Sequence, residues 1–236
     1  MAKTKTYGHY CAAARSLEVI GDKWSLLIVR DLLPGPQRFS DLKGTLRAIT
    51  PKLLTTRLRE LEASGVIERD EAEGRREVWY RLTPAGRALR PVITELLVWG
   101  VEHAAPPTPS DTVSARRAGI TFSAILNRRR LIPGQPRLWR LQFDPETISF
   151  IRFDGERWLP ELVPNVEPDL VIEARADQWV AMLRAEDEAR NELLAEMRVE
   201  GAPEAVGEFE GLFVVERASL LPSPTAVGEG VAEGRG

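Results

Sequence analysis

Cysteine and histidine are scarce in this chain of 236 residues. Its single cysteine, Cys11, excludes an intrachain disulfide and any site built from several thiolates. With only His9 and His103, a His-based metal centre or a Ser–His–Asp triad is not expected. Residues 115–220 also lack a glycine-rich phosphate loop and a carboxylate pair with a partner base. We therefore expect no metal, no cofactor and no enzymatic activity.

Long hydrophobic runs are missing as well. No apolar run approaches the roughly 18 residues that a membrane span needs. The segment from Met1 to Tyr10 is polar and lacks the apolar core of a secretory signal. We therefore expect a cytoplasmic protein without membrane contact. Hydrophobic residues make up 43% and charged residues 28%, which is ordinary globular composition and excludes wholesale disorder.

The net charge of −3 conceals an uneven distribution along the chain. Residues 1–104 hold 17 Lys and Arg against 13 Asp and Glu, whereas residues 105–236 hold 15 against 22. Every lysine precedes residue 53. A basic half joined to an acidic half indicates a nucleic-acid module joined to something else, and a drift in surface charge is the alternative.

A proline-rich stretch predicts the domain boundary. Pro106, Pro107 and Pro109 cannot continue a helix and favour an extended connector. We expect a first domain over residues 1–104, a linker over 105–114 and a second domain over 115–221. The tail over 222–236, rich in Gly, Pro, Ala and Glu, is expected to be disordered.

The first domain is predicted to contain short helices, a β-hairpin and a further helix. The fourth helix starts at Thr50-Pro51, a capping hydroxyl followed by proline at the first helical position, and ends at Gly65. Its predicted buried stripe is Leu54, Leu58 and Leu61. Strands near 66–69 and 78–82 flank a turn over 71–76. Another Thr-Pro pair, at 83–84, opens a fifth helix with a wide apolar face.

This pattern resembles the HxlR-type transcriptional regulators over Cys11 to Gly100. Four stretches carry the resemblance: LEVIGDKWSLLIVRDLL (17–33), RFSDLKGTL (38–46), ITPKLLTTRLRELEASGVIER (49–69) and VWYRLTPAGRALRPVI (78–93). The chain departs from the family at Ala12, where proline is usual after the cysteine. The resemblance implies a bacterial-type winged helix-turn-helix regulator. It also implies a homodimer through the first and fifth helices, although the fifth could instead pack on the second domain. Such a dimer would bind double-stranded DNA at a pseudo-palindromic operator.

The candidate DNA contacts follow from this scaffold. A recognition helix needs one polar face for the major groove, and the N–H groups at its start suit a phosphate. Arginines in a wing can reach phosphates or the minor groove. Each arginine taken alone could also be a solvated surface group. The candidate residues are Arg38, Thr50, Lys52, Thr55, Thr56, Arg57, Arg59, Arg75 and Arg76.

Cys11 has two interpretations. Some regulators of this family sense oxidants through a cysteine near this position, and the first turn of a helix can lower the pKa of a thiol. A second cysteine that could resolve an oxidised form within the chain is lacking. We therefore favour a buried structural cysteine, with a redox role as the alternative.

The second domain resembles the sterol-carrier-protein type-2-like domain. The resemblance is carried by DLVIEARADQWVAML (169–183) and AEMRVEGAPEAVGEFEGLF (195–213), with Ala202 where that family has an aspartate. It implies an α+β fold around an apolar tunnel, and hence a lipid-like or other apolar small-molecule effector. Alternating strand residues and one helix stripe supply the candidate lining. These residues, which could equally be plain core, are Trp139, Leu141, Phe143, Trp179, Met182 and Leu183.

The sequence thus predicts a DNA-binding transcriptional regulator whose second domain senses an apolar ligand. One alternative is a redox-sensing regulator switched at Cys11, with a structural second domain. Another is a lipid carrier or enzyme-like protein that the helix-turn-helix only localises.

Overall fold

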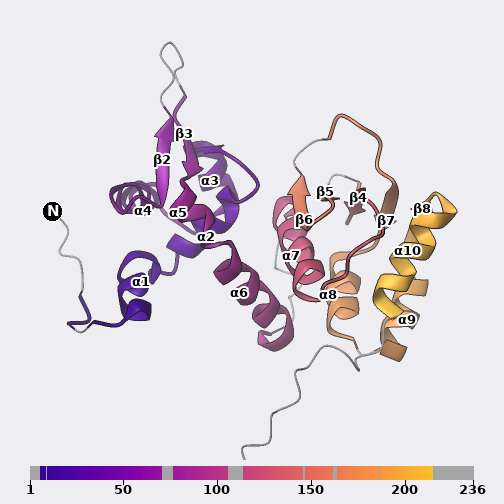
Figure 1. Ribbon diagram of the computed structural model, residues 1–236. Helices are drawn as coiled ribbons and strands as arrows, with labels where there is room; N and C mark the ends of the chain where they lie inside the picture. The colour runs from indigo at the N-terminus through magenta and orange to yellow at the C-terminus, as the bar shows by residue number, and fades with distance from the viewer. Residues whose placement is uncertain are drawn as a thin grey trace, which may run out of the picture.

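The computed structural model describes residues 6–8, 10–70, 77–105, 114–145, 147–161, 164–185 and 187–214 (Figure 1). The predicted limits of the linker and the tail fall largely outside these ranges. The domain boundaries therefore stay a prediction. Among the described residues, no helix is long and apolar enough to cross a membrane.

The first half forms a winged helix-turn-helix around one hydrophobic core. Its elements are α1 (Ala12–Ile20), α2 (Ser25–Leu32), β1 (Gln37–Arg38), α3 (Phe39–Thr45), α4 (Pro51–Ala63), β2 (Ile67–Asp70), β3 (Trp79–Leu82), α5 (Pro84–Arg87) and α6 (Arg90–His103). The strands form an antiparallel sheet in the order β1-β3-β2. Leu54, Leu58 and Leu61 are buried as predicted, and this stripe fixes which face of α4 is outward.

Local capping explains where the recognition helix begins and ends. The Thr50 hydroxyl accepts a hydrogen bond from the Leu53 N–H at 3.3 Å, and Pro51 occupies the first turn of α4. Gly65 has φ of +72°, a conformation that favours glycine after a helix. The Thr83 hydroxyl donates to the Gly65 carbonyl at 2.6 Å. The chain entering α5 is therefore tied to the end of α4.

The single fifth helix expected after Thr83 is wrong, because the structure has two helices there. α5 spans four residues, and α6 begins at Arg90. Pro91 explains the break: it has no N–H to donate to the preceding turn, and its ring would clash with that turn's carbonyl. In the first turn of a new helix, Pro91 meets neither problem.

The second half consists of a five-stranded sheet with helices packed against it (Figure 1). Its elements are α7 (Ala115–Arg128), β4 (Arg137–Gln142), β5 (Ile148–Phe153), β6 (Trp158–Glu161), β7 (Leu170–Glu173), α8 (Ala176–Arg184), α9 (Asp187–Ala195), β8 (Arg198–Gly201) and α10 (Pro203–Val214). The strand order is β6-β5-β4-β7-β8, and β4 and β7 are parallel whereas the other neighbours are antiparallel. Side chains of the sheet and of α7, α8 and α10 form one hydrophobic core.

Helix α6 contributes to both hydrophobic cores. Ile93 and Leu97 belong to the core of the winged half. Val98 and Val101 pack against the core of the second half. Since both sets lie on one helix, the two halves share a structural element.

Candidate nucleic-acid interface

Helix α4 presents a polar face opposite its buried leucines. Lys52, Thr56 and Arg59 are exposed on it, and Thr55 is half-buried. Among the residues that the structure describes, neither Lys52 nor Arg59 has an acidic partner within ion-pair distance. Both cations are therefore available to a negatively charged ligand.

The threonine hydroxyls of this helix bond within it. Thr55 donates to the Pro51 carbonyl at 2.9 Å, and Thr56 donates to the Lys52 carbonyl at 3.0 Å. A hydroxyl that donates to its own helix still has oxygen lone pairs with which to accept. In this arrangement Thr55 and Thr56 are suited to accept hydrogen bonds from donor groups on base edges.

Arg57 and Arg38 are already engaged within the winged half. The Arg57 guanidinium lies 2.9 Å from an Asp22 carboxylate oxygen and also pairs with Glu60, so it holds α4 to the segment before α2. The Arg38 guanidinium lies 2.6 Å from Glu77 and also pairs with Asp41. The hydrogen bonds to these two carboxylates raise the pKa of Arg38. These two guanidiniums position structural elements, and their role as DNA contacts stays a prediction.

Two basic side chains missed by the sequence analysis lie in the last turn of α3 and in the turn between α3 and α4. Arg47 is exposed there, and Lys43 donates from Nζ to the Arg47 carbonyl at 3.2 Å. Their signal was present in the sequence, as basic residues just before the recognition helix. The predicted wing contacts Arg75 and Arg76 lie outside the described residues.

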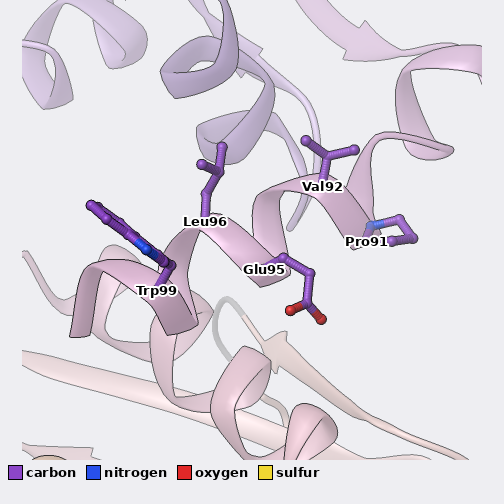
Figure 2. A pocket seen from close by; sticks show the side chains of 5 residues that line it. All are labelled: Pro91, Val92, Glu95, Leu96 and Trp99. Carbon is purple, nitrogen blue, oxygen red and sulfur yellow. The ribbon is translucent and has the colours of Figure 1, made fainter. Parts of the chain in front are cut away.

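An apolar strip runs along the outer side of α6. Figure 2 shows Val92, Leu96 and Trp99 projecting from one side of this helix. Leu96 is 48% and Trp99 59% exposed, and together with Pro91 and Glu95 these residues line an open pocket of about 600 Å³. On α1, Leu17 and Val19 are also exposed. The apolar residues that face outward from α6 thus differ from those that pack on the second half.

Cys11 is exposed, so its interpretation as a buried structural cysteine is wrong. It occupies the N-cap position of α1, and its side chain makes no capping hydrogen bond. Its redox role stays a prediction. Among the described residues, no group of three or more His, Cys, Asp or Glu is placed to hold a metal ion.

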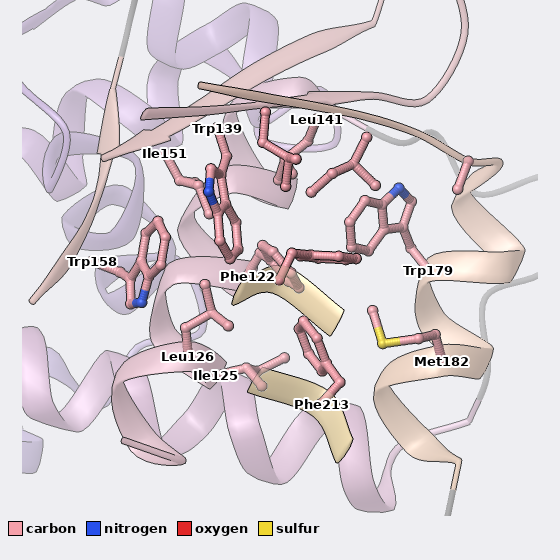
Figure 3. Packing of buried hydrophobic residues seen from close by; sticks show 14 of the residues in the cluster. Phe122, Ile125, Leu126, Trp139, Leu141, Ile151, Trp158, Trp179, Met182 and Phe213 are labelled. Atoms are coloured by element: carbon pink, nitrogen blue, oxygen red, sulfur yellow. The ribbon is translucent and has the colours of Figure 1, made fainter. Parts of the chain in front are cut away.

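The predicted ligand-lining residues lie in the core of the second half (Figure 3). Trp139, Trp179 and Met182 are buried, as are Leu141 and Leu183. Phe143 is partly buried and packs against them. The pocket on α6 and a smaller one beside the first turn of α7 are lined by other residues. The role of the predicted lining residues in the core as a ligand site stays a prediction.

Two indole N–H groups in this core have no hydrogen-bond partner among the described residues, those of Trp139 and Trp179. By contrast, the Trp158 indole donates to the Leu131 carbonyl at 2.7 Å. A buried donor without a partner is unfavourable unless a further group accepts its hydrogen bond.

Comparisons with known proteins bear on the winged half. A family model described as HxlR-like helix-turn-helix matches residues 19–107. YvaP of Bacillus subtilis, an uncharacterized HTH-type transcriptional regulator, is 37% identical over 93 residues, which are 39% of this chain and 86% of YvaP. YtcD of the same organism, also an uncharacterized regulator, is 44% identical over 89 residues, or 37% of this chain and 71% of YtcD.

Among solved structures, the redox regulator HypR in its oxidized form is 35% identical and has a TM-score of 0.37, covering 38% of this chain and 94% of that one. The sequence relatives are named as transcriptional regulators and align with the winged half. This chain belongs to the HxlR-like helix-turn-helix family of transcriptional regulators.

Proposed function

We propose that this regulator binds a specific pseudo-palindromic operator in double-stranded DNA through α4. The observation that carries the proposal is the outward face of α4, where Lys52 and Arg59 lack acidic partners among the described residues and Thr56 lies between them. Thr50 caps the helix, and the N–H groups at its start suit a phosphate. Arg75 and Arg76 would add contacts to phosphates or the minor groove. Lys43 and Arg47, which precede α4, would add further cations to this interface.

The first prediction concerns Lys52. An operator selected from random DNA provides the substrate, and Lys52→Ala is expected to weaken its binding by about 1–3 kcal/mol if Lys52 reads a base edge. The loss on unrelated DNA should be much smaller. The exposed Arg198 of β8 provides a matched control, because Arg198→Ala removes a cation far along the chain and should leave both affinities unchanged.

Fluorescence anisotropy at several salt concentrations separates the possible roles of Lys52. A phosphate contact would lower the log–log salt slope by about 0.9 and weaken all DNA equally. Equal losses on operator and unrelated DNA would contradict base reading. An unchanged affinity for both would remove this face of α4 from the interface.

The proposal includes a homodimer that pairs through α1 and α6. Its support is the exposed strip of Val92, Leu96 and Trp99, together with Leu17 and Val19 of α1. Burying such apolar side chains against a second copy is favourable by about 25 cal/mol per Å². A twofold axis would place two α4 helices about one DNA turn apart.

The second prediction places a charge in this strip. Leu96→Glu should shift the protein from dimer to monomer in sedimentation measurements at micromolar concentration, because a carboxylate in an apolar interface loses its hydration. Ile132→Glu is the matched control, since Ile132 is similarly exposed, at 57%, but lies after α7. It should leave the mass unchanged. A Leu96→Glu protein that stays dimeric would place the interface elsewhere.

We further propose that the second half is a sterol-carrier-like domain that binds an apolar effector. In support, its core joins a sheet to three helices, and the unpartnered indole N–H groups of Trp139 and Trp179 could donate to a polar group on such a ligand. An effector would change DNA affinity only by binding the DNA-competent and DNA-incompetent geometries unequally.

A further inference from the structure

A small pocket lies where the winged half meets the second half. Its walls come from the turn after α2, the first turn of α7 and strands β5 and β6. Its volume is about 200 Å³, below the roughly 300–1,000 Å³ of sites for drug-sized ligands. Residues that line it include Pro34, Arg116, Ile148, Ser149, Pro160 and Glu161. Such a pocket suits a small molecule.

The N-terminus of α7 opens at this pocket. This helix has 14 residues, and its N-cap, Ser114, makes no side-chain capping hydrogen bond. Its first turn contains no acidic residue but has Arg116 and Arg117. The N–H groups and positive dipole end of a helix favour an anion, and this helix supplies none of its own.

Arg116 adds a cation that makes no ion pair with a described carboxylate, although the charge of Asp31 acts on it at longer range. Its Nε and one terminal nitrogen donate to the Asp31 carbonyl at 3.2 and 3.1 Å. No carboxylate within the described ranges lies within ion-pair distance of Arg116. Burial lowers the pKa of Arg116, which reflects the cost of leaving the charge poorly solvated. A guanidinium has five N–H donors, so donors remain for a ligand.

Ser149 supplies an independent indication of a ligand. Its residue is only 6% exposed, it lines the pocket, and its hydroxyl has no hydrogen-bond partner among the described residues. The hydroxyl lies against α7 where that helix crosses β5: a Cβ on Gly119 would be 2.3 Å from it. The Oγ atom itself is not fully buried, so it is reached from the pocket and can donate a hydrogen bond to a ligand there.

We infer that this pocket binds a small organic monocarboxylate with a compact apolar body. The carboxylate would accept hydrogen bonds from Arg116, from Ser149 and from the free N–H groups of α7. The apolar body would lie against Pro34, Ile148 and Pro160.

Glu161 limits the ligand to a single negative charge. Its carboxylate also lines the pocket and pairs with Arg152 at 2.8 Å. A second negative charge on the ligand would face this carboxylate, which disfavours phosphate and dicarboxylates. Because Pro34 belongs to the winged half and the other lining residues to the second half, the bound acid would contact both.

The test is calorimetric titration of the full chain with isovalerate, without DNA, so its outcome is independent of operator recognition. Isovaleramide serves as the uncharged isostere and inorganic phosphate as the alternative anion. Isovalerate should bind, and the other two should bind at least tenfold more weakly. Ser149→Ala should weaken isovalerate binding about tenfold, and Arg116→Met should abolish it.

Two matched variants control for changes that merely affect α7. Ser123 lies on α7, is also buried and also lacks a partner, but it does not line the pocket. Arg128 lies on the same helix and pairs with Glu95 at 3.1 Å. Ser123→Ala and Arg128→Met should bind isovalerate as the natural protein does.

Several results would overturn the inference. They are no binding of isovalerate at millimolar concentration, equal binding of isovaleramide or phosphate, or binding that Ser149→Ala leaves unchanged. Arg116→Met also removes two hydrogen bonds to α2, so it could alter the fold. In that case Ser149→Ala decides, because its hydroxyl makes no hydrogen bond that the fold would lose.

Discussion

Replacing Trp139 with alanine is expected to lower the free energy of unfolding by about 3–5 kcal/mol, the usual cost of deleting a buried tryptophan. Trp139 is fully buried on β4. Its ring centroid lies 4.3 Å from that of Trp158 and 5.3 Å from that of Phe209. The substitution therefore removes contacts with two aromatic neighbours and leaves a cavity between sheet and helices.

Urea denaturation followed by circular dichroism measures this effect. Tyr10→Ala is the control, because Tyr10 is an aromatic residue that is 93% exposed, and it should leave the midpoint within error. The same experiment shows how much of the Trp139 ring is packed. A loss of about 3–5 kcal/mol is compatible with the proposed effector if the ligand reaches the indole N–H while the ring stays packed. A loss below about 1 kcal/mol would show instead that much of the ring faces ligand or water.

The winged half could be predicted from the sequence because its signals are local. Thr50-Pro51 specifies a helix start through one hydroxyl and one ring, and Gly65 permits the positive φ that ends the helix. Leucines at i, i+4 and i+7 specify the buried face of α4. Pro91 also carries a local signal, the break between α5 and α6. The prediction of a single helix followed the continuous apolar stripe instead.

The second half was harder to predict because its decisive interactions are not local. Helix α7 starts after Ser114, which makes no capping hydrogen bond, and its first turn holds two arginines, so its start signal in the sequence is weak. Those arginines become favourable only when α2 and α3 supply carbonyl acceptors, the Asp31 and Thr45 oxygens. Likewise, alternation identifies Trp139 and Leu141 as inward, but only the packed structure shows how far other side chains fill the space around them.

Long-range contacts also limit what the sequence can predict about the candidate DNA contacts. Composition and spacing place arginines on the right element, yet they do not reveal which guanidiniums have acidic neighbours from elsewhere in the chain. Arg57 meets Asp22, 35 positions earlier, and Arg38 meets Glu77, 39 positions later. Lys52 and Arg59 keep their candidacy because no described acid approaches them. Long-range ion pairs thus distinguish the candidate arginines that also hold structural elements together from those without an acidic partner among the described residues.

The second large effect is expected at Asp31, where Asp31→Ala should cost about 3–5 kcal/mol, as for breaking a buried ion pair. Asp31 is fully buried at the end of α2, and the Arg30 guanidinium lies 2.7 Å from its Oδ1. Burial lowers the pKa of Arg116 and of Arg117, and the charge of Asp31 acts in the opposite direction on both. The Asp31 carboxylate thus pairs with Arg30 and acts at longer range on the guanidiniums of Arg116 and Arg117.

Asp31→Asn separates charge from shape, because the amide retains an oxygen acceptor but loses the negative charge. If the negative charge is decisive, Asp31→Asn should recover little of the unfolding free energy that Asp31→Ala loses. If the hydrogen bond to Arg30 is decisive, Asp31→Asn should recover most of it. Asp177→Ala is the control, since Asp177 pairs with Arg175 at 2.9 Å on the open surface and should leave the denaturation midpoint unchanged. An Asp31→Ala protein as stable as the natural one would contradict the role of Asp31 as counter-ion. The three arginines would then have to be stabilised by the Asp31 and Thr45 carbonyls and by solvent, and α7 would be held to the winged half mainly by its apolar contacts with α6.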